Sequence, residues 1–331
     1  MTFIILIFSQ EQTCIILKRA GTSLNRYRDY NTYLREIFVE RVQKITLDAG
    51  LGCPNRDGTI SRNGCIYCDA RGSGTGAMIH CGTSITDQIT GARTYLAKRF
   101  KAKKFIAYFQ SFSNTYAPIP KLQALYDQAL LQEDMVGLSV ATRPDCVDRD
   151  VLSLIASYKD KYLVWIEYGL QSAHDNTLRL INRGHDVACF ERSVLLTHEY
   201  GINICVHVIL GLPEETRQMM LDTARFLARL PVQGVKIHML YVVKGSRLAE
   251  LYSRGEVHCL ERDEYVELVA DFLELLPSDM VIQRLTGDPV KSELIAPSWA
   301  SEKTKNLNMI RETLDRRNTC QGRLGGLSKH T

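Results

Sequence analysis

The chain has 331 residues, 45% of them hydrophobic and 24% charged, with a formal net charge of +4. This composition is ordinary for a globular protein, and the length suits one large α/β domain with an appendage, or two domains. No segment approaches the roughly 18 consecutive apolar residues of a membrane span, which excludes a membrane-spanning class. The charge is uneven: residues 1–47 carry seven Lys/Arg against four Asp/Glu, residues 301–331 carry seven against three, and the body between them is slightly acidic.

Ten cysteines are many for an intracellular chain, but they do not form the spaced pairs of a disulfide framework. A disulfide scaffold of this size would be unusual, so we infer a reducing compartment and expect a cytoplasmic protein with no membrane partner. The N-terminal run TFIILIF is too short for a membrane span and lacks the basic region of a signal peptide. We interpret it as an extra strand or a misassigned start. The cysteines that stand alone are Cys14, Cys146, Cys189, Cys205, Cys259 and Cys320.

Strand and helix patterns alternate from about residue 42 onward. Thr83 or Ser84 and Asp148 are candidate N-caps for two of the helices. The amphipathic helical stretches are residues 84–100, 118–133, 148–158, 186–200 and 214–230. The strand candidates, rich in Val, Ile, Tyr and Phe, are residues 42–50, 104–110, 136–142, 162–170, 202–210 and 234–243.

This alternation predicts an α/β fold with a parallel sheet and right-handed crossovers. Six strand–helix units predict a partial (β/α)6 TIM-like barrel, in which reactive residues gather at the C-terminal ends of the strands. Two further helical stretches, 261–276 and 301–317, flank the short segment 280–289 and predict a small helical C-terminal extension packed on the barrel. The predicted regions are an N-terminal extension (1–40), the barrel core (41–250) and a C-terminal extension with a basic tail (251–331).

Three cysteines follow the first predicted strand in the stretch GLGCPNRDGTISRNGCIYC. Cys53, Cys65 and Cys68 are spaced C-x11-C-x2-C. Three thiolates can hold three irons of a [4Fe–4S] cluster and leave the fourth iron open for chemistry. The loop from Asp48 to about Thr83 is long for a compact domain, so we expect a bound group to order it.

Other metal and redox chemistries also use closely spaced cysteines. A structural zinc site could be closed by Cys81 or His80. Zinc ribbons usually have two C-x2-C knuckles, however, and Cys81 lacks a partner two residues away. A thioredoxin-like redox pair is less favoured, because no helical pattern begins at Cys65.

The cysteine loop and the motifs after it resemble a known family. An iron–sulfur loop after the first strand of a partial barrel, with Tyr67 before the last cysteine, resembles the radical S-adenosylmethionine superfamily. The usual spacing there is C-x3-C-x2-C, and the longer first gap here is similar to the elongator-like branch. More closely, the chain resembles a bacterial family of similar length linked to side-chain modification of tRNA wobble uridine. Its motifs occur here in order over residues 30–323: ITLDAGLGCPNRDG, GCIYC, YFQSFSNTYAP, ATRPD, EYGLQS, INRGH, HVILGLPEET and VKIHMLYVVKG.

This resemblance implies a [4Fe–4S] cluster on the three cysteines and S-adenosylmethionine bound across the strand ends. Reductive cleavage of that cofactor would give methionine and a 5′-deoxyadenosyl radical that abstracts hydrogen from a substrate. Gln110, at the end of the second strand, is the candidate for the methionine amine. Gln171 and Arg183 occupy positions that hold the ribose and the carboxylate in relatives, and an arginine fork suits a carboxylate.

Three further residues complete the implied cofactor site. Tyr67 would lie beside the adenine through its backbone, and Ile209 would pack on the adenine. His207 occupies a position where many relatives carry an acidic ribose ligand. Each assignment has a purely structural alternative, since Ile209 is a core residue on any interpretation and Gln171 could simply end a strand.

Several polar residues in apolar strands have two open interpretations. Glu167 needs a partner if it is buried, and is either an ion pair or a contact to substrate or cofactor. Arg143 and Asp145 are expected to form a structural pair at the barrel mouth. His238 on the sixth strand is interpreted as a core histidine rather than one that faces the substrate.

The resulting hypothesis is a radical S-adenosylmethionine enzyme whose substrate is a tRNA wobble uridine. The resemblance implies the substrate, and the basic ends agree with binding a phosphate backbone. A flavodoxin or ferredoxin is the expected reductant. The alternatives are a radical enzyme acting on a small molecule or protein side chain, and a zinc-stabilised binding module without catalysis.

Overall fold

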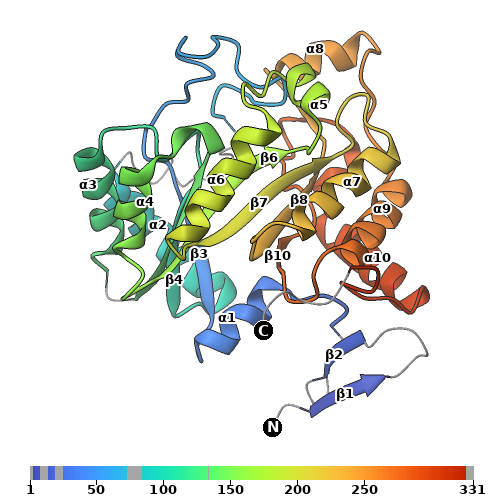
Figure 1. The fold of residues 1–331 in the computed structure, drawn as a ribbon, viewed down its shortest axis with the longest axis horizontal. Helices are drawn as coiled ribbons and strands as arrows, with labels where there is room; N and C mark the ends of the chain where they lie inside the picture. Colours follow the sequence, from blue (N-terminus) through green and yellow to red (C-terminus); the bar gives the residue numbers. More distant parts are fainter. Residues whose placement is uncertain (1–2, 8–13, 19–24, 73–83, 133, 326–331) are drawn as a thin grey trace.

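A computed structural model describes residues 3–7, 14–18, 25–72, 84–132 and 134–325, the first two segments by backbone alone. The apolar N-terminal run forms strand β1 (Phe3–Ile7), which pairs antiparallel with β2 (Cys14–Lys18). Both lie apart from the main sheet (Figure 1). The expectation of an extra strand at this end is therefore confirmed.

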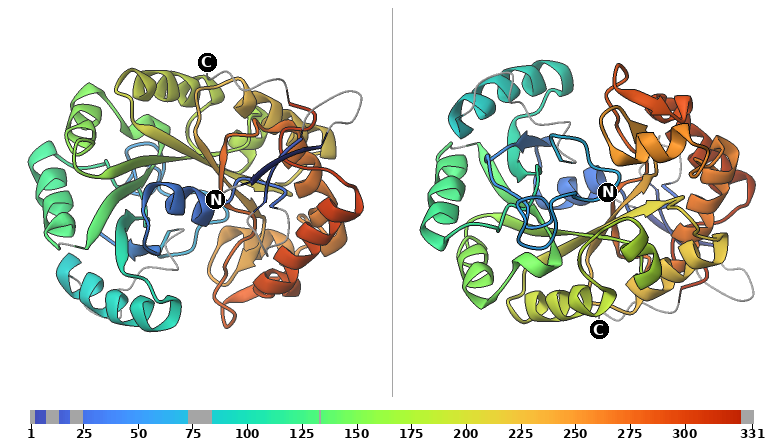
Figure 2. Two further views of the ribbon diagram at one scale, coloured as in Figure 1. Left: turned by 90° about the horizontal axis from the view of Figure 1, so that it is seen from below. Right: turned by 90° about the horizontal axis from the view of Figure 1, so that it is seen from above.

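The centre of the molecule is a seven-stranded parallel sheet that curls into a half-barrel (Figure 2). Its order is β10-β8-β7-β6-β5-β4-β3, so each of the six predicted strands lies beside its neighbour in sequence. The predicted α/β partial barrel is confirmed, with a seventh strand at one edge. The strands are β3 (Val42–Leu47), β4 (Lys104–Phe109), β5 (Met135–Thr142), β6 (Leu163–Gln171), β7 (Asn203–Leu210), β8 (Gly234–Met239) and β10 (Val281–Arg284).

Helices cover the outer, convex face of this sheet (Figure 2). Ser84 and Asp148 cap two of them, as predicted, by accepting a hydrogen bond from a backbone N–H in the first turn. The stretch expected to begin at residue 214 begins at Arg217 instead, because Thr216 caps the helix and Glu214 has φ 62°. The helices are α2 (Ile85–Phe100), α3 (Ile119–Leu130), α4 (Arg149–Ala156), α5 (Asp175–Leu180), α6 (Val187–Glu199) and α7 (Arg217–Ala228).

A short helix that the sequence did not predict closes the N-terminal end of the half-barrel. Helix α1 (Tyr30–Ile37) lies across that end (Figure 2). Its Tyr30 and Tyr33 rings contact the Trp165 ring edge-on, with centroids 6.3 and 5.7 Å apart. This apolar packing seals one end, so the interior of the barrel opens toward the C-terminal ends of the strands.

The C-terminal part contributes to the sheet as well as covering it. Strand β10 pairs in parallel with β8, whereas the sequence placed this segment in an extension packed on the barrel. The short strands β9 (Val242–Val243) and β11 (Leu294–Ala296) pair antiparallel with each other in a separate two-stranded sheet. The two expected C-terminal helices are confirmed as α9 (Arg262–Leu275) and α10 (Lys303–Arg316), and α8 (Arg247–Ser253) precedes them.

The basic residues of α10 are largely neutralised within the fold. Arg316 and Arg317 contact Glu267, and Arg317 also lies 2.5 Å from Asp271. Lys303 lies 2.7 Å from Asp288. These ion pairs hold α10 against its neighbours. The surface of the C-terminal part is therefore less positively charged than its count of Lys and Arg residues indicates.

Two expectations about the chain as a whole can be compared with the structure. Within the described segments, no helix combines the length and apolar character needed to cross a membrane. Cys320, which the sequence showed standing alone, is disulfide-bonded. Seven other cysteines of the described part are free thiols, including Cys53, Cys65 and Cys68.

Candidate active site

One cavity opens at the C-terminal ends of the strands, beneath the loop that follows β3, which is the blue loop at the top of Figure 1. Its walls come from that loop and from the inner face of the half-barrel. This is where reactive residues gather in β/α barrels. The cavity is lined by every residue predicted from the sequence to hold metal or cofactor: Cys53, Cys65, Tyr67, Cys68, Gln110, Gln171, Arg183, His207 and Ile209.

The eleven residues between the first two cysteines form a compact turn. The Cys53 carbonyl accepts the backbone N–H of Arg56 at 2.8 Å, and Gly64 N–H donates to the Asn55 carbonyl at 2.8 Å. These bonds fold the long gap back on itself and bring Cys65 to the same cavity as Cys53. A second short turn, closed by Cys68 N–H on the Cys65 carbonyl at 3.1 Å, brings in the third thiol.

Residues 181–184 anchor this loop to the barrel. Asn55 is fully buried, and its Nδ2 donates to the Asn182 carbonyl at 2.7 Å and to Cys65 Sγ at 3.6 Å. Asn182 returns a bond of 2.6 Å to the Gly64 carbonyl. Gly184 has φ 79°, and a Cβ there would lie 2.8 Å from Asn55 Oδ1. Only glycine therefore permits this close approach.

Two expectations about this loop stay predictions. Residues 48–72 form hydrogen bonds among themselves and with residues 181–184, and whether a bound group is needed to order them is not tested by these contacts. Cys81 and His80, the zinc ligands considered as an alternative, lie outside the described residues.

Positive charge surrounds the buried thiol of Cys65. Arg183 is 6% exposed, and its Nη1 lies 3.7 Å from Cys65 Sγ. The pKa of Cys65 is held well below its usual range by a hydrogen bond from Cys68, against the effect of burial, with further help from Arg183 and Arg143. A thiolate is the form that binds metal, so this environment suits a metal ligand.

Arg143 takes the structural role expected of it. Its guanidinium makes a two-pronged pair with Asp145, at 2.8 and 2.7 Å, and donates to the Arg183 carbonyl at 2.8 Å. The pair thus supports the segment that carries Arg183.

The end of β6 is distorted at Gln171, one of the predicted cofactor residues. The pairing of β6 with β7 is irregular between Gly169 and Gln171, and Gln171 has φ 79°, a left-handed conformation that is costly for a residue with a side chain. A Cβ on Gly169 would lie 2.6 Å from Gln171 Nε2 and 2.8 Å from Arg183 Nη2. Glycine at 169 therefore lets both side chains cross over the strand into the cavity.

Arg183 is already engaged on one side of its fork. Nη2 and Nε donate to the Gly169 carbonyl at 2.7 and 3.2 Å, while Nη1 reaches Cys65. Tyr67 and Ile209 lie in one apolar cluster with Leu212 and Leu240, which forms an apolar wall beside the cysteines.

Below the cysteine loop, one buried carboxylate on β6 contacts side chains from four other strands. Glu167 on β6 is fully buried and accepts from Lys44 of β3 at 2.5 Å and from Ser139 of β5. Its second oxygen contacts Lys236 of β8 and lies 2.7 Å from His207 Nε2 of β7. Although burial opposes ionisation, the two lysines hold the pKa of Glu167 well below its usual range. Of the two interpretations that the sequence left open, the structure shows an ion pair.

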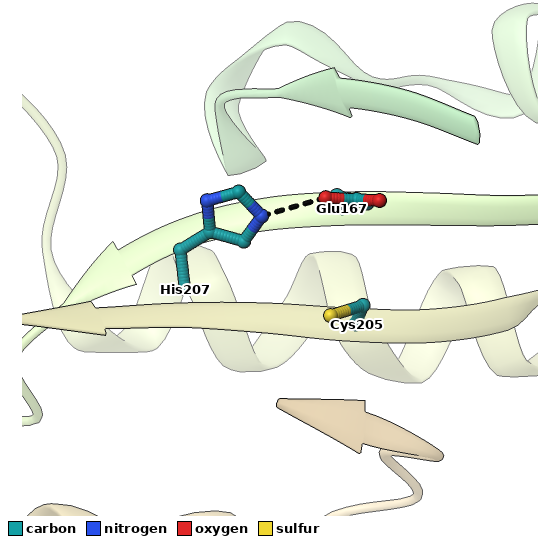
Figure 3. A group of neighbouring side chains, drawn as sticks. All are labelled: Glu167, Cys205 and His207. Carbon is teal, nitrogen blue, oxygen red and sulfur yellow. Dashed lines mark hydrogen bonds and ion pairs between the residues drawn. The ribbon is translucent and has the colours of Figure 1, made fainter. Parts of the chain in front are cut away.

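His207 is oriented by this carboxylate (Figure 3). Burial lowers the pKa of His207 to about 4, so the ring is neutral at physiological pH. Because a carboxylate only accepts, the ring proton lies on Nε2, and Nδ1 is left as an acceptor.

Glu167, Cys205 and His207 lie close enough to suggest a metal site, with ligand atoms within 4.8 Å of one another. Two observations argue against it. The carboxylate oxygens already receive two ammonium groups, which would repel a cation. Burial raises the pKa of the Cys205 thiol, so it stays protonated and is a poor ligand.

Sequence reasoning missed three cations in or beside this cavity: Lys44, Lys236 and Arg284. For Lys44 and Lys236 a usable signal existed, since a charged residue inside a strand buried on both faces must point to a polar interior. No such signal marked Arg284, because its strand was not predicted. The interpretation of His238 as a core residue was wrong, because it lines the cavity and its Nε2 has no partner in the part of the chain that is described.

Comparisons with known proteins agree with this architecture. The model of the Radical SAM superfamily matches residues 51–227, and that of the Radical_SAM C-terminal domain matches residues 232–316. The Bacillus subtilis protein YtqA is 42% identical over 90% of this chain and 92% of its own length. A Methanocaldococcus jannaschii protein is 39% identical over 89% of this chain and 91% of its own.

More distant similarities extend to the elongator-like proteins. A Dehalococcoides mccartyi protein named tRNA uridine(34) acetyltransferase is 29% identical over 47% of this chain and 34% of its own. Among solved structures, Elp3 of the archaeon Methanocaldococcus infernus superposes with a TM-score of 0.62 at 16% identity, covering 85% of this chain and 64% of that one. The last likeness is one of fold.

Proposed function

The chain belongs to the radical SAM superfamily, and we propose that it is a tRNA-modifying member whose cluster is held by Cys53, Cys65 and Cys68. Enzymes of this superfamily use a [4Fe–4S] cluster and S-adenosylmethionine, and they require a reductant. One observation carries the assignment of residues: the three cysteines and all six predicted cofactor side chains line a single cavity.

The donor set fits such a cluster. Three free thiols from one loop supply three ligands, and Asn55 and Arg183 each direct an N–H toward Cys65 Sγ. Hydrogen bonds to cluster sulfurs are among the features that tune iron–sulfur sites. When bound, the cluster and S-adenosylmethionine supply a 5′-deoxyadenosyl radical.

The remaining residues would bind and orient the cofactor. Gln171, turned inward at the irregular end of β6, and His207, with Nδ1 as an acceptor, are suited to the two ribose hydroxyls. Tyr67 and Ile209 offer the apolar wall for adenine, and Gln110, which directly follows β4, lines the same cavity. Arg183 would stabilise the charge beside Cys65 as well as the cofactor carboxylate.

The proposed substrate is a tRNA wobble uridine. The support is the distant similarity to a protein named as a tRNA uridine(34) acetyltransferase, over about half of this chain. The basic ends add little, because the α10 cations are largely paired. A flavodoxin or ferredoxin remains the proposed electron donor.

Anaerobic turnover tests the chemistry first. The reconstituted, reduced protein is incubated with S-adenosylmethionine and assayed for 5′-deoxyadenosine, beside Cys65→Ala and Cys68→Ala. We expect about four irons with sulfide per chain. We also expect the wild type to form 5′-deoxyadenosine and both variants to form none. One zinc per chain without sulfide would instead favour the structural zinc site.

Nucleoside analysis then tests the substrate. Bulk tRNA from a strain lacking this protein is digested, and its modified uridines are compared with those of a strain that carries the Cys65→Ala variant and of the parent. We expect one wobble-uridine derivative to change in both mutant strains. Unchanged tRNA in both, with 5′-deoxyadenosine still formed in vitro, would place the substrate among small molecules or proteins.

A further inference from the structure

The lower part of the cavity carries more positive than negative charge. Lys44, Lys236 and Arg284 lie in or beside it, and within the described ranges Glu167 is the one carboxylate that contacts the two lysines. The other two carboxylates lining the cavity, Asp69 and Asp288, pair with Arg71 and Lys303. Unbalanced charge in a buried site is costly unless a ligand or solvent compensates it.

Arg284 differs from the two lysines. Its side chain forms no hydrogen bond or ion pair with any residue in the described ranges, and the residue lines the cavity. Lys44, by contrast, has three acceptors, on Glu167, Ser139 and Gln283. The five N–H donors of an arginine fork match a carboxylate or phosphate.

An irregularity in β10 directs this arginine inward. Consecutive residues of a regular strand point to opposite faces, yet Gln283 reaches Lys44 at 2.8 Å inside the barrel and Arg284 lines the same interior. The pairing of β10 with β8 shifts register between Ile282 and Arg284, as a β-bulge does. Such bulges re-aim side chains beside active sites, so the position of Arg284 is a built feature of the edge strand.

The neighbouring strand adds a second unsatisfied donor or acceptor. Lys236 is the register partner of Arg284, and His238 follows two residues later on the same face of β8. The Nε2 atom of His238 is buried without a hydrogen-bond partner among the described residues. Lys236 itself contacts Glu167 and donates to the Tyr108 hydroxyl at 2.9 Å.

We propose that Arg284 and His238, with Lys236 beside them, bind an oxyanion of the substrate: a carboxylate or a phosphate group that enters the half-barrel below the cofactor. The site lies on β8 and β10, whereas the cysteines lie on the loop after β3. We call Lys44, Glu167 and Lys236 the charged floor of the half-barrel. An anion held by Arg284 and His238 places the rest of the substrate between this floor and the residues that would bind the cofactor. This inference deepens the proposed function, since it rests on the same cavity being the reaction site.

Binding of simple anions tests the proposal without turnover. Wild-type holoenzyme with S-adenosylmethionine bound is titrated by calorimetry with sodium acetate, inorganic phosphate and uridine 5′-monophosphate, against sodium chloride at equal ionic strength. We expect saturable binding of at least one oxyanion. Tighter binding of acetate would identify a carboxylate source, and tighter binding of the phosphate probes a phosphate source.

Variants locate the site. Arg284→Gln should weaken the bound probe at least tenfold, and Arg284→Lys should recover part of that loss because it keeps the charge but not the fork. His238→Ala should weaken the same probe to a smaller extent. The matched control is Arg62→Gln, an exposed arginine on the cysteine loop, which should bind like wild type.

Three results would overturn the proposal. They are no saturable binding of any probe, equal binding by wild type and Arg284→Gln, and loss of S-adenosylmethionine affinity in Arg284→Gln with anion binding unchanged. The last would assign Arg284 to the cofactor. Formation of 5′-deoxyadenosine by wild type is measured separately, so failure of the proposed radical function is distinguishable from failure of this site.

Discussion

The cysteine loop and the charged floor of the half-barrel line the same cavity but are built in opposite ways. The loop brings together three residues within one short stretch, and its shape comes mainly from local turns. The floor joins Lys44, Glu167 and Lys236, which belong to three separate strands far apart in sequence. A local site leaves a spacing that can be recognised, whereas a site assembled across strands leaves isolated polar residues in apolar runs.

The two regions also differ in what they contribute to stability. The loop thiols are arranged to bind the cluster, and they need no partner from the protein for the chain to fold. The floor residues are partners of one another, so removing one leaves a buried charge uncompensated. We therefore expect changes in the loop to affect cofactor content first and changes in the floor to affect stability first.

The largest effect is expected from a thiol of the loop. Changing a residue that only orients metal ligands typically costs about 10–100-fold in affinity or activity, so Cys65→Ser should cost more than that in cluster retention and product formation. Iron and sulfide analysis after anaerobic desalting measures it. The urea unfolding curve of the cluster-free protein should change little, and a large loss of stability there would contradict the separation of the two regions.

The next largest effect is expected at the floor. Glu167→Ala leaves two lysines buried without their carboxylate, which should lower the unfolding free energy by about 3–5 kcal/mol. Urea denaturation of the cluster-free protein measures this. The double variant Glu167→Met/Lys236→Met should recover part of the loss, because it leaves one unpaired lysine instead of two. A loss below about 1 kcal/mol in the single variant would show that solvent reaches this carboxylate.

Acid titration sharpens the same contrast. Burial lowers the pKa of His207 in the folded state to about 4, from the ordinary histidine value of 6.5. The folded state then binds fewer protons than the unfolded state between these values, so His207 contributes stability that is full above pH 6.5 and lost as the pH falls toward 4. The contribution is at most about 3–4 kcal/mol.

The measurement compares unfolding free energies at several pH values for wild type and His207→Gln. The glutamine can still donate to Glu167 but does not titrate, so its profile should be flatter between pH 6.5 and 4. Parallel profiles would show that His207 does not control this range.

The smallest effect is expected at the anchor of the loop. Asn55→Ala removes the bond to the Asn182 carbonyl and the N–H that points at Cys65, which should lower stability by about 1–2 kcal/mol and speed loss of the cluster. Thermal unfolding and the rate of iron release to a chelator measure the two effects. Asn63→Ala, an exposed residue of the same loop, is the control and should resemble wild type.

How much could be predicted depends on how far apart the contributing residues lie. The six central strands, most of their helices and the cysteine triplet follow from patterns within short windows, and the resemblance placed six further side chains that the structure brings to one cavity. The helix at 30–37 was missed because its tyrosines pack against Trp165, a contact that the local sequence pattern does not reveal. The seventh strand was missed because four residues carry too little periodicity to stand out.

The sequence by itself therefore determined the parallel half-barrel, the position of the cysteine loop and the superfamily chemistry that this loop serves. Only the tertiary structure decided that Glu167 is in an ion pair, that His207 is neutral with Nδ1 as an acceptor, and that the Arg284 side chain, at the cavity, has no partner in the part of the chain that is described. The physical reason is that burial, charge balance and proton position depend on neighbours from other strands. Periodicity reports which face of an element is apolar, but not which charges meet inside.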